Sequence, residues 1–155
     1  MRDAFGSDVE PKLVDDIRGD DCYRPELALV AERDGEIVGH VMISWCALHS
    51  ADGTVHRIAM LSPLAVAPAV QRDGIGGALV RDVCARADAA GDPMVILEGS
   101  PAYYSRFGFV DARTLGITIH VPDWAPPEAG QALPLTRYDS AFGGHVVYPP
   151  PFDGL

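Results

Sequence analysis

Basic residues are scarce in this sequence. Twelve Lys and Arg stand against 22 Asp and Glu among 155 residues, which gives a formal net charge of −10. A chain of this charge should repel nucleic-acid phosphates, so DNA or RNA binding is not expected. A negative surface could favour a cationic substrate such as an amine, and simple solubility is the alternative explanation.

Cysteine and long apolar runs are scarce as well. Cys22, Cys46 and Cys84 are odd in number and widely spaced, which indicates neither a disulfide framework nor a zinc site. The five histidines have no metal-ligand spacing, so no metal is predicted. No apolar run approaches the ~18 residues of a membrane span. The start, MRDAFGSDVEPK, lacks the basic and apolar stretches of a secretory signal, and we expect a cytoplasmic protein with no membrane partner.

What is present is the composition of a folded domain. Hydrophobic residues make up 48% of the chain, and the length predicts one domain over residues 1–155. Asp8–Arg18 has apolar residues at helical spacing and predicts a short amphipathic helix. Glu26–Arg33 and Glu36–Leu48 flank Asp34-Gly35, a pair typical of a type I′ turn, and therefore predict a β-hairpin.

A strand–helix–strand pattern follows the hairpin. Val55–Val66 reads as a strand in which Pro63, having no N–H to donate, predicts a bulge or a break in pairing. Apolar residues then recur every four positions from Ile75 to Ala87, as on one face of a helix. Met94–Leu97 is a continuous apolar run, typical of a strand covered on both faces. The pattern predicts an α+β fold with a mixed, mostly antiparallel sheet and one βαβ crossover.

The entrance of that helix, QRDGIGGALV (Gln71–Val80), has three glycines in four positions. At a helix start the first N–H groups lack partners within the helix, and the helix dipole places partial positive charge there. Gly74, Gly76 and Gly77 would expose these donors without Cβ atoms, and Arg72 would add a charge, so a phosphate cradle is predicted. A tight turn or close helix–sheet packing is the alternative use of such glycines.

Two other phosphate-binding loops fit this stretch less well. A P-loop ends in Gly-Lys-Ser/Thr, whereas Gly77 is followed by Ala78-Leu79. The dinucleotide fingerprint needs Gly or Ala at the place of Leu79, although Glu98 could mimic its ribose-binding acid. The antiparallel strands that come first also argue against a doubly wound sheet, which leaves a dinucleotide-binding protein as a minor alternative.

Two ordered motifs resemble those of the GNAT N-acetyltransferase superfamily. Val66-Ala67-Pro68 followed by Gln71–Gly76 resembles motif A, in which a strand ends in Val-x-Pro before Gln/Arg-x-x-Gly-x-Gly/Ala. Tyr104-Ser105-Arg106-Phe107-Gly108-Phe109 resembles the family's Tyr-x-x-x-Gly-Phe. The motifs lie on either side of the predicted strand Met94–Leu97, as the family arrangement requires. The resemblance covers more than half of the chain, from Glu26 to Phe109.

The resemblance implies an enzyme that transfers an acetyl group directly from acetyl-CoA to a primary amine. The pyrophosphate of acetyl-CoA would lie on backbone N–H groups between Arg72 and Ala78. Its pantetheine arm would pair with a splayed strand near Leu64 and Val66. A backbone N–H near Val66 would polarise the thioester carbonyl. The acceptor would be a small metabolite, an antibiotic amine, a peptide or a protein N-terminus. The implied cofactor-binding residues are Leu64, Ala65, Val66, Gln71, Arg72, Asp73, Gly74, Ile75, Gly76, Gly77, Ala78, Ser100 and Tyr104.

By the same resemblance Tyr104 would be the general acid that protonates the departing CoA thiolate. An ordinary packing role is the alternative for Tyr104, and Tyr103 is expected in packing or in a pocket wall. The general base stays open: Glu98, at the C-terminal end of its strand, could act directly or through a water, and a structural role is the alternative for it. The alternatives are His56, Ser62, His40 and bulk water.

The sequence departs from the family pattern in two places. The family has an Asn where this chain has Leu97, and Ser100 is the candidate substitute. The family also opens with a strand before its first helix, whereas this chain begins near the helix, so we expect that strand to be missing or replaced by another segment. An uncovered sheet edge invites pairing with a second chain, and a homodimer through that edge is a hypothesis.

The C-terminal third predicts further strands at Leu115–Val121, Ala132–Tyr138 and His145–Tyr148, which would close an acceptor pocket. Trp124 lies between them in a proline-rich loop. The alternative to an enzyme is a catalytically silent module that binds acyl-CoA as a sensor.

Overall fold

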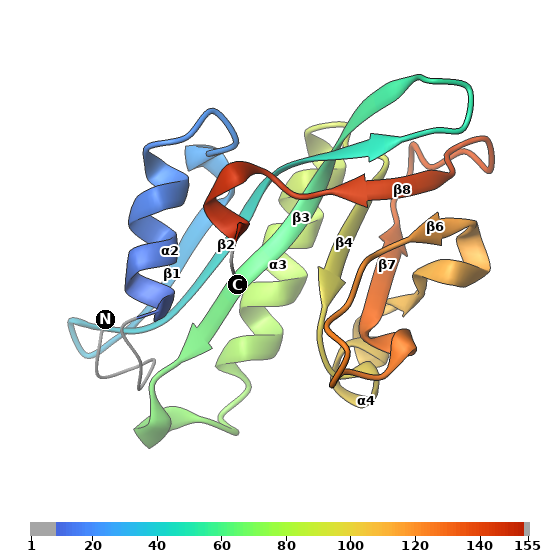
Figure 1. The fold of residues 1–155 in the computed structure, drawn as a ribbon. Coiled ribbons are helices and arrows are strands. Elements are labelled where there is room, and N and C mark those ends of the chain that lie inside the picture. The colour runs from blue at the N-terminus through green and yellow to red at the C-terminus, as the bar shows by residue number, and fades with distance from the viewer. Residues whose placement is uncertain (1–8, 154–155) are drawn as a thin grey trace.

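An eight-stranded mixed sheet is the frame of the fold in the computed structural model, which describes residues 9–153 (Figure 1). The strand order is β5-β7-β4-β3-β2-β8-β6, and β1 pairs with β2 beside this path. Neighbouring strands are antiparallel except β3 with β4 and β6 with β8, which confirms the predicted mixed sheet. The strands are β1 (Ala28–Arg33), β2 (Glu36–His49), β3 (Val55–Val66), β4 (Met94–Glu98), β5 (Val110–Asp111), β6 (Ile117–Thr118), β7 (Gly130–Pro134) and β8 (Gly144–Val147).

Two helices cover the two faces of the sheet. Side chains alternate between faces along a strand, so Val41 and Ile43 of β2 pack against α3 while Met42 packs against α2. Figure 1 shows α3 behind β2 and β3, linking β3 to the parallel strand β4 as the predicted βαβ crossover. The α-helices are α2 (Val9–Arg18), α3 (Ile75–Ala89) and the single turn α4 (Pro101–Tyr104).

The predicted turn chemistry holds in the first hairpin. Asp34 and Gly35 join β1 to β2, and both have positive φ, +54° and +82°. A type I′ turn requires this pair of angles, which Asp and Gly adopt at low cost.

The third strand is bulged and then splays away from its parallel neighbour. The register between β2 and β3 shifts opposite Ser62-Pro63, where Pro63 was predicted to disturb the pairing. β3 pairs with β4 only at Ala59 and Met60, so the two strands separate beyond that point. Backbone groups on one side of Leu61–Val66 therefore face a gap, and such groups need other partners.

Two of the three predicted C-terminal strands are shorter than expected, and the third is shifted by one residue. Leu115–Val121 holds only the two residues of β6, because a 3₁₀ turn at Ala112–Leu115 precedes it. That turn is stabilised by Asp111, whose carboxylate accepts a hydrogen bond from the backbone N–H of Arg113. The predicted strand Ala132–Tyr138 is observed as Gly130–Pro134, and His145–Tyr148 as Gly144–Val147.

The predicted sheet edge lies at β1. Among residues 9–153, β1 pairs with β2 alone, and Val30 on it is 52% exposed. Residues 1–8, where the family would have its first strand, lie outside the described part of the chain. The homodimer therefore stays a prediction. None of the described helices is long and apolar enough to cross a membrane.

Candidate active site

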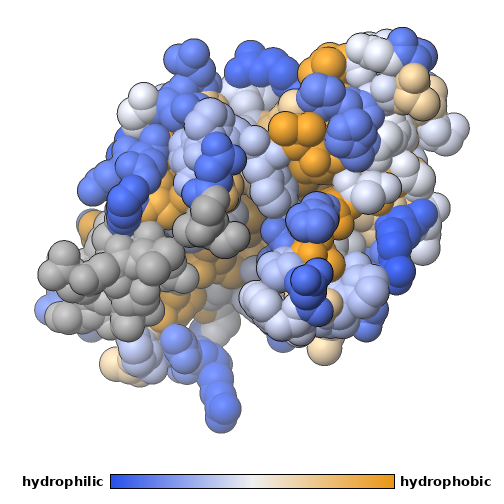
Figure 2. Space-filling view, viewed as in Figure 1, coloured by the Kyte–Doolittle hydropathy of each residue, from blue (hydrophilic) through white to orange (hydrophobic). Residues whose placement is uncertain are grey.

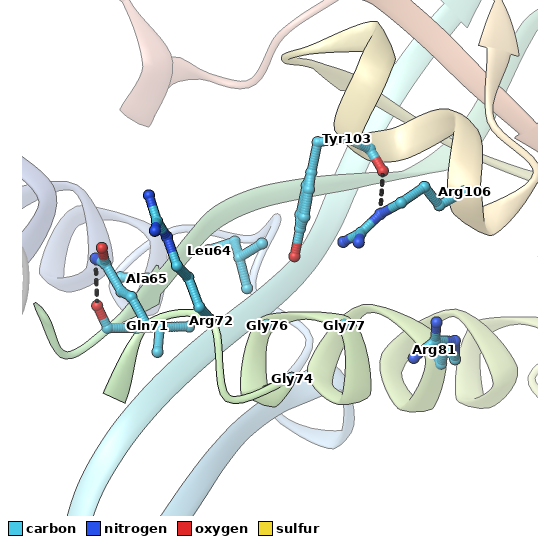
Figure 3. Close-up of a pocket in the computed structure, with 11 residues that line it drawn as sticks. Leu64, Ala65, Gln71, Arg72, Gly74, Gly76, Gly77, Arg81, Tyr103 and Arg106 are labelled. Carbon is cyan, nitrogen blue, oxygen red and sulfur yellow. Dashed lines mark hydrogen bonds between the residues drawn. The ribbon is translucent and has the colours of Figure 1, made fainter. Parts of the chain in front are cut away.

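A cavity of about 580 Å³ lies between the start of α3, the splayed half of β3 and the segment around α4 (Figure 3). Its walls come from three parts of the chain that the sequence motifs had marked. The lining residues are Leu64, Ala65, Val66, Gln71, Arg72, Gly74, Gly76, Gly77, Arg81, Tyr103 and Arg106.

The helix entrance presents backbone donors to this cavity. Gly74 caps α3 with a left-handed conformation (φ +84°), no side chain caps the helix, and no acidic residue stands in its first turn. The first N–H groups are thus left with the partial positive charge of the helix start. At Gly76 a Cβ would lie 2.8 Å from the Tyr103 hydroxyl oxygen, so the absence of a side chain keeps this turn open.

The cavity is cationic within an acidic protein. Among residues 9–153, Arg72, Arg81 and Arg106 line it and no carboxylate does. Asp73, the nearest acid in the sequence, lies outside the lining and pairs with Arg33 at 2.8 Å. A polyanion can therefore approach both the guanidinium groups and the helix start without meeting a negative charge.

Tyr103 forms the wall opposite the helix. Figure 3 shows its ring reaching from the α4 segment toward α3, with the hydroxyl pointing toward the start of that helix. The Arg106 guanidinium carbon lies 4.6 Å from the centre of this ring, and its Nε donates to the Tyr103 carbonyl oxygen at 3.2 Å. Tyr103 therefore belongs to the pocket wall, one of the two roles expected for it.

The structure gathers most of the predicted cofactor-binding residues here, with three exceptions around the helix start. Ile75 packs against the core, and Ala78 and Asp73 lie outside the lining. Sequence reasoning missed Arg81 and Arg106. The signal for Arg81 was its place four residues after Gly77, on the same helix face, where its guanidinium would lie 3.1 Å from a Cβ on Gly77.

A second cavity, of about 850 Å³, borders the neighbouring part of β3. Met60–Ser62 line this one and Leu64–Val66 line the first, so the two cavities flank the bulge at Pro63. Seen from the side of Figure 1, hydrophobic surface is exposed in the middle of the molecule between more hydrophilic halves (Figure 2). The lining residues are Met60, Leu61, Ser62, Glu98, Gly99, Ser100, Pro101, His120, Pro122, Trp124, Ala125, Pro126, Ala129, Val146, Tyr148 and Phe152.

Glu98 stands at the end of β4, open to the second cavity. The Tyr148 hydroxyl donates a hydrogen bond of 2.6 Å to Glu98 Oε2. Burial, followed by this bond and the carboxylate charge, raises the pKa of Tyr148 well above its usual value, so Tyr148 stays a donor at neutral pH. Ser62 and Ser100 line the same cavity, and Ser100 also caps α4 by accepting a hydrogen bond from Tyr103 N.

Tyr104 lies in an aromatic cluster and lines neither cavity. Its ring contacts Tyr103 at 4.8 Å and Phe109 at 5.7 Å between centroids, and it approaches the backbone of Gly99. Burial raises the pKa of Tyr104 to about 12, so its hydroxyl carries a proton at neutral pH. A protonated phenol is the form that a general acid requires.

The two candidate histidines, His40 and His56, line neither cavity. His56 packs edge-on against Phe142 at 4.9 Å between ring centroids. His40 is buried on the sheet face that α2 covers, and neither ring nitrogen has a hydrogen-bond partner among residues 9–153. Burial, with a smaller contribution from the Arg18 charge, lowers the pKa of His40 to about 4.

The buried imidazole of His40 predicts a loss of stability in acid. Its pKa is about 4 in the folded chain and 6.5 in the unfolded chain, so between these pH values only the unfolded state takes up the proton. The free energy of unfolding should fall as pH falls through this window, by up to about 1.4 kcal/mol per pH unit. Urea unfolding at pH 7 and pH 5 measures this slope. In His40→Met the part of this pH dependence that is due to His40 should be missing. An unchanged slope in the variant would show that His40 is not its source.

No group of three or more His, Cys, Asp or Glu side chains that could hold a metal ion is found in the described range.

Together the two cavities offer an anion cradle, a gap in the sheet and a carboxylate–tyrosine pair.

Comparisons with known proteins agree with this arrangement. A family described as "Acetyltransferase (GNAT) domain" matches residues 1–111. The Escherichia coli K12 protein named "Uncharacterized N-acetyltransferase YjhQ" is 36% identical over 107 residues, which are 68% of this chain and 58% of that protein. The chain thus spans less than two thirds of that relative's length.

Two solved structures cover nearly the whole fold. A GNAT family N-acetyltransferase (YhbS) from Escherichia coli, in complex with CoA, superposes with a TM-score of 0.84 at 31% identity, over 98% of this chain and 82% of that one. A GNAT family acetyltransferase from Brucella melitensis, in complex with acetyl-CoA, has a TM-score of 0.74 at 30% identity, over 98% and 86%.

Proposed function

Because the chain belongs to the GNAT acetyltransferase family, we propose that it transfers an acetyl group from acetyl-CoA to a primary amine. The observation that carries the proposal is the uncapped, glycine-rich start of α3, which faces three arginines beside a splayed strand. These features suit the diphosphate and the amide-rich arm of acetyl-CoA. The CoA and acetyl-CoA complexes of the two structural relatives support the choice of ligand.

In this proposal the N–H groups between Arg72 and Ala78 hold the diphosphate, with the side chains of Arg72, Arg81 and Arg106 around it. The backbone of Leu64–Val66 on the side away from β2 binds the pantetheine arm, beside the Val66 carbonyl that accepts a hydrogen bond from Gln71 Nε2 at 3.1 Å. The thioester then lies at the splay, between the two cavities, and the amine approaches from the second.

The acceptor nitrogen must lose two protons, one from its ammonium group before attack and one from the tetrahedral intermediate, while the departing sulfur gains one. Glu98, directly or through a water, takes a proton from the acceptor's ammonium group, which frees the nitrogen lone pair. The nitrogen attacks the thioester carbonyl, and a backbone N–H near Val66 stabilises the oxyanion. When the C–S bond breaks, Tyr104 gives its proton to the departing thiolate. The nitrogen then gives its second proton to the Tyr104 phenolate, and the proton that Glu98 took is released to water. The products are the neutral acetamide and CoA with a free thiol.

Calorimetry with CoA and a thiol-release assay with acetyl-CoA and a panel of primary amines test the proposal. Micromolar CoA binding and amine-dependent thiol release are expected. CoA binding without transfer to any amine would favour a silent acyl-CoA module. Stabilisation by NAD in place of CoA would favour a dinucleotide binder.

At Arg72 a substitution can remove the charge while the backbone keeps its conformation. It holds a left-handed conformation (φ +75°), which Asn adopts more readily than most residues do. Arg72→Asn should therefore fold at least as well as the parent chain while the Kd for CoA rises by about tenfold, the loss of one charge-assisted hydrogen bond. Thermal unfolding and calorimetry measure the two effects. An unchanged Kd would remove Arg72 from the cradle.

A further inference from the structure

The second cavity combines one carboxylate with walls that are largely apolar. Of the residues that the structure describes, Glu98 is the one acidic residue in its lining, and no Lys or Arg lines it. The remaining wall is formed mainly by apolar and aromatic side chains, such as Met60, Pro122, Trp124 and Phe152. Trp124 is 86% exposed, so a large apolar side chain stands free at this cavity. A site of this kind orients its ligand by few polar groups and binds it by apolar contact.

The Glu98 carboxylate is held by a tyrosine from a distant part of the sequence. Tyr148 lies just beyond β8, 50 positions after Glu98, and its ring packs against Phe152 at 6.0 Å between centroids. Its hydroxyl donates to Oε2 of Glu98, which leaves Oε1 for a ligand. Burial raises the pKa of the Tyr148 phenol, so the hydroxyl keeps its proton at neutral pH and keeps donating to the carboxylate.

We infer that the acceptor is a monoamine with an apolar body, and that Tyr148 is a positioning residue that orients Glu98 to receive the acceptor's ammonium group. The inference rests on the proposed acetyl transfer and adds the class of acceptor to it. Glu98 pairs with the ammonium group, while the apolar body lies along the wall formed by Trp124 and Phe152.

The same walls disfavour other amines. An acceptor with its own carboxylate would meet Glu98 and find no cationic side chain in the lining. A polyamine would place its second ammonium group against apolar side chains, and a sugar amine would leave its hydroxyl groups unpaired there. Polar groups without partners are costly to bury, which is how such a cavity rejects them.

Four amines that share a six-carbon chain test the acceptor class: hexylamine, 6-aminohexan-1-ol, 6-aminohexanoate and 1,6-diaminohexane. They differ only in the far end of the chain. With acetyl-CoA saturating, kcat/KM for hexylamine should exceed each of the others by about tenfold or more. Equal values, or a preference for 6-aminohexanoate or 1,6-diaminohexane, would overturn the inference.

Tyr148→Phe tests the positioning role, because it removes the hydroxyl and keeps the ring. We expect kcat/KM for hexylamine to fall by about tenfold, with KM for acetyl-CoA unchanged. The fall should lie in KM for hexylamine, because a carboxylate without this hydrogen bond is free to turn away from the ammonium group. The effect acts through Glu98, so adding Tyr148→Phe to Glu98→Gln should change KM for hexylamine no further. An unchanged KM for hexylamine in Tyr148→Phe would reduce Tyr148 to a packing role.

Tyr138→Phe is the matched control, because Tyr138 is also half-buried but lines neither cavity. It should leave kcat and KM for hexylamine as in the parent chain.

A binding measurement separates this inference from the proposed function. Trp124 is exposed at the cavity, whereas Trp45 is stacked between Arg24 and Arg57 at 3.7 and 4.2 Å, so amine binding should change the fluorescence of Trp124. With CoA present, hexylamine should give a saturable change that is absent in Trp124→Phe and weakened in Glu98→Gln. A change of this kind without acetyl transfer would support the acceptor class and count against the enzyme. Acetyl transfer without any preference among the four amines would support the proposed enzyme and count against the acceptor class.

Discussion

Tyr104→Phe is expected to slow acetyl transfer by roughly 10²–10⁴-fold, the usual contribution of a general acid. The hydroxyl carries its proton at neutral pH because burial raises the pKa of Tyr104 to about 12. The variant keeps the ring that contacts Tyr103 and Phe109, so the aromatic cluster should remain packed. Single-turnover measurements with acetyl-CoA, beside calorimetry with CoA, should give a much lower rate and an unchanged Kd.

Tyr103→Phe is the matched control, because the two tyrosines are neighbours in the chain with different surroundings. Tyr103 lines the first cavity and points its hydroxyl at the helix start, so its loss should act on CoA binding more than on the rate. If instead Tyr103→Phe abolishes turnover and Tyr104→Phe does not, the acid role passes to Tyr103. If neither variant slows the reaction, no tyrosine of this motif is the acid.

The parts of the site that could be predicted are those that local chemistry determines. Asp34-Gly35 requires a tight turn, Pro63 disturbs the strand in which it lies, and glycines at a helix start leave its donors bare. Each of these rules acts over a few residues. The hairpin, the bulge and the uncapped helix were therefore readable from the order of residues alone.

The acceptor side could not be read in this way, because its residues meet only through the sheet. Glu98 and Tyr148 are 50 positions apart, and their hydrogen bond depends on β8 pairing with β2 while β4 pairs with β3. The strand prediction for Leu115–Val121 was wrong in extent for a related reason. Its alternating pattern is local, whereas the turn ordered by Asp111 and Arg113 shortens the strand from outside the pattern.

The cationic lining of the first cavity is another feature that could not be predicted from the sequence. Arg81 and Arg106 are unremarkable in sequence, one on a helix and one inside a motif read for its tyrosine. Only the fold brings them to the same cavity as Arg72. The formal charge of −10 therefore hides a local patch of the opposite sign, and net charge alone could not have found it.

Gly76→Asp should raise the Kd for CoA by at least about 100-fold without destabilising the protein. The new carboxylate would stand in the cradle, repel the diphosphate and compete for the same N–H groups. Losing two charge-assisted hydrogen bonds at about 1.5 kcal/mol each gives about 3 kcal/mol, or roughly 100-fold in Kd. Asp in the first turn of a helix is favourable, since it complements the dipole and can accept from the free donors. The only close contact is with the Tyr103 hydroxyl, at the tip of a side chain that can shift.

Ala85→Asp is the control for this charge, because Ala85 is exposed on the same helix and lines neither cavity. It should leave the Kd for CoA nearly unchanged. Thermal unfolding should give Gly76→Asp a melting temperature equal to or above that of the parent chain, so that lost binding is not lost folding. A stable Gly76→Asp variant that still binds CoA with the parent's affinity would mean that the start of α3 does not hold the diphosphate. The placement of the coenzyme along β3, and of the thioester between the two cavities, would then have to be abandoned with it.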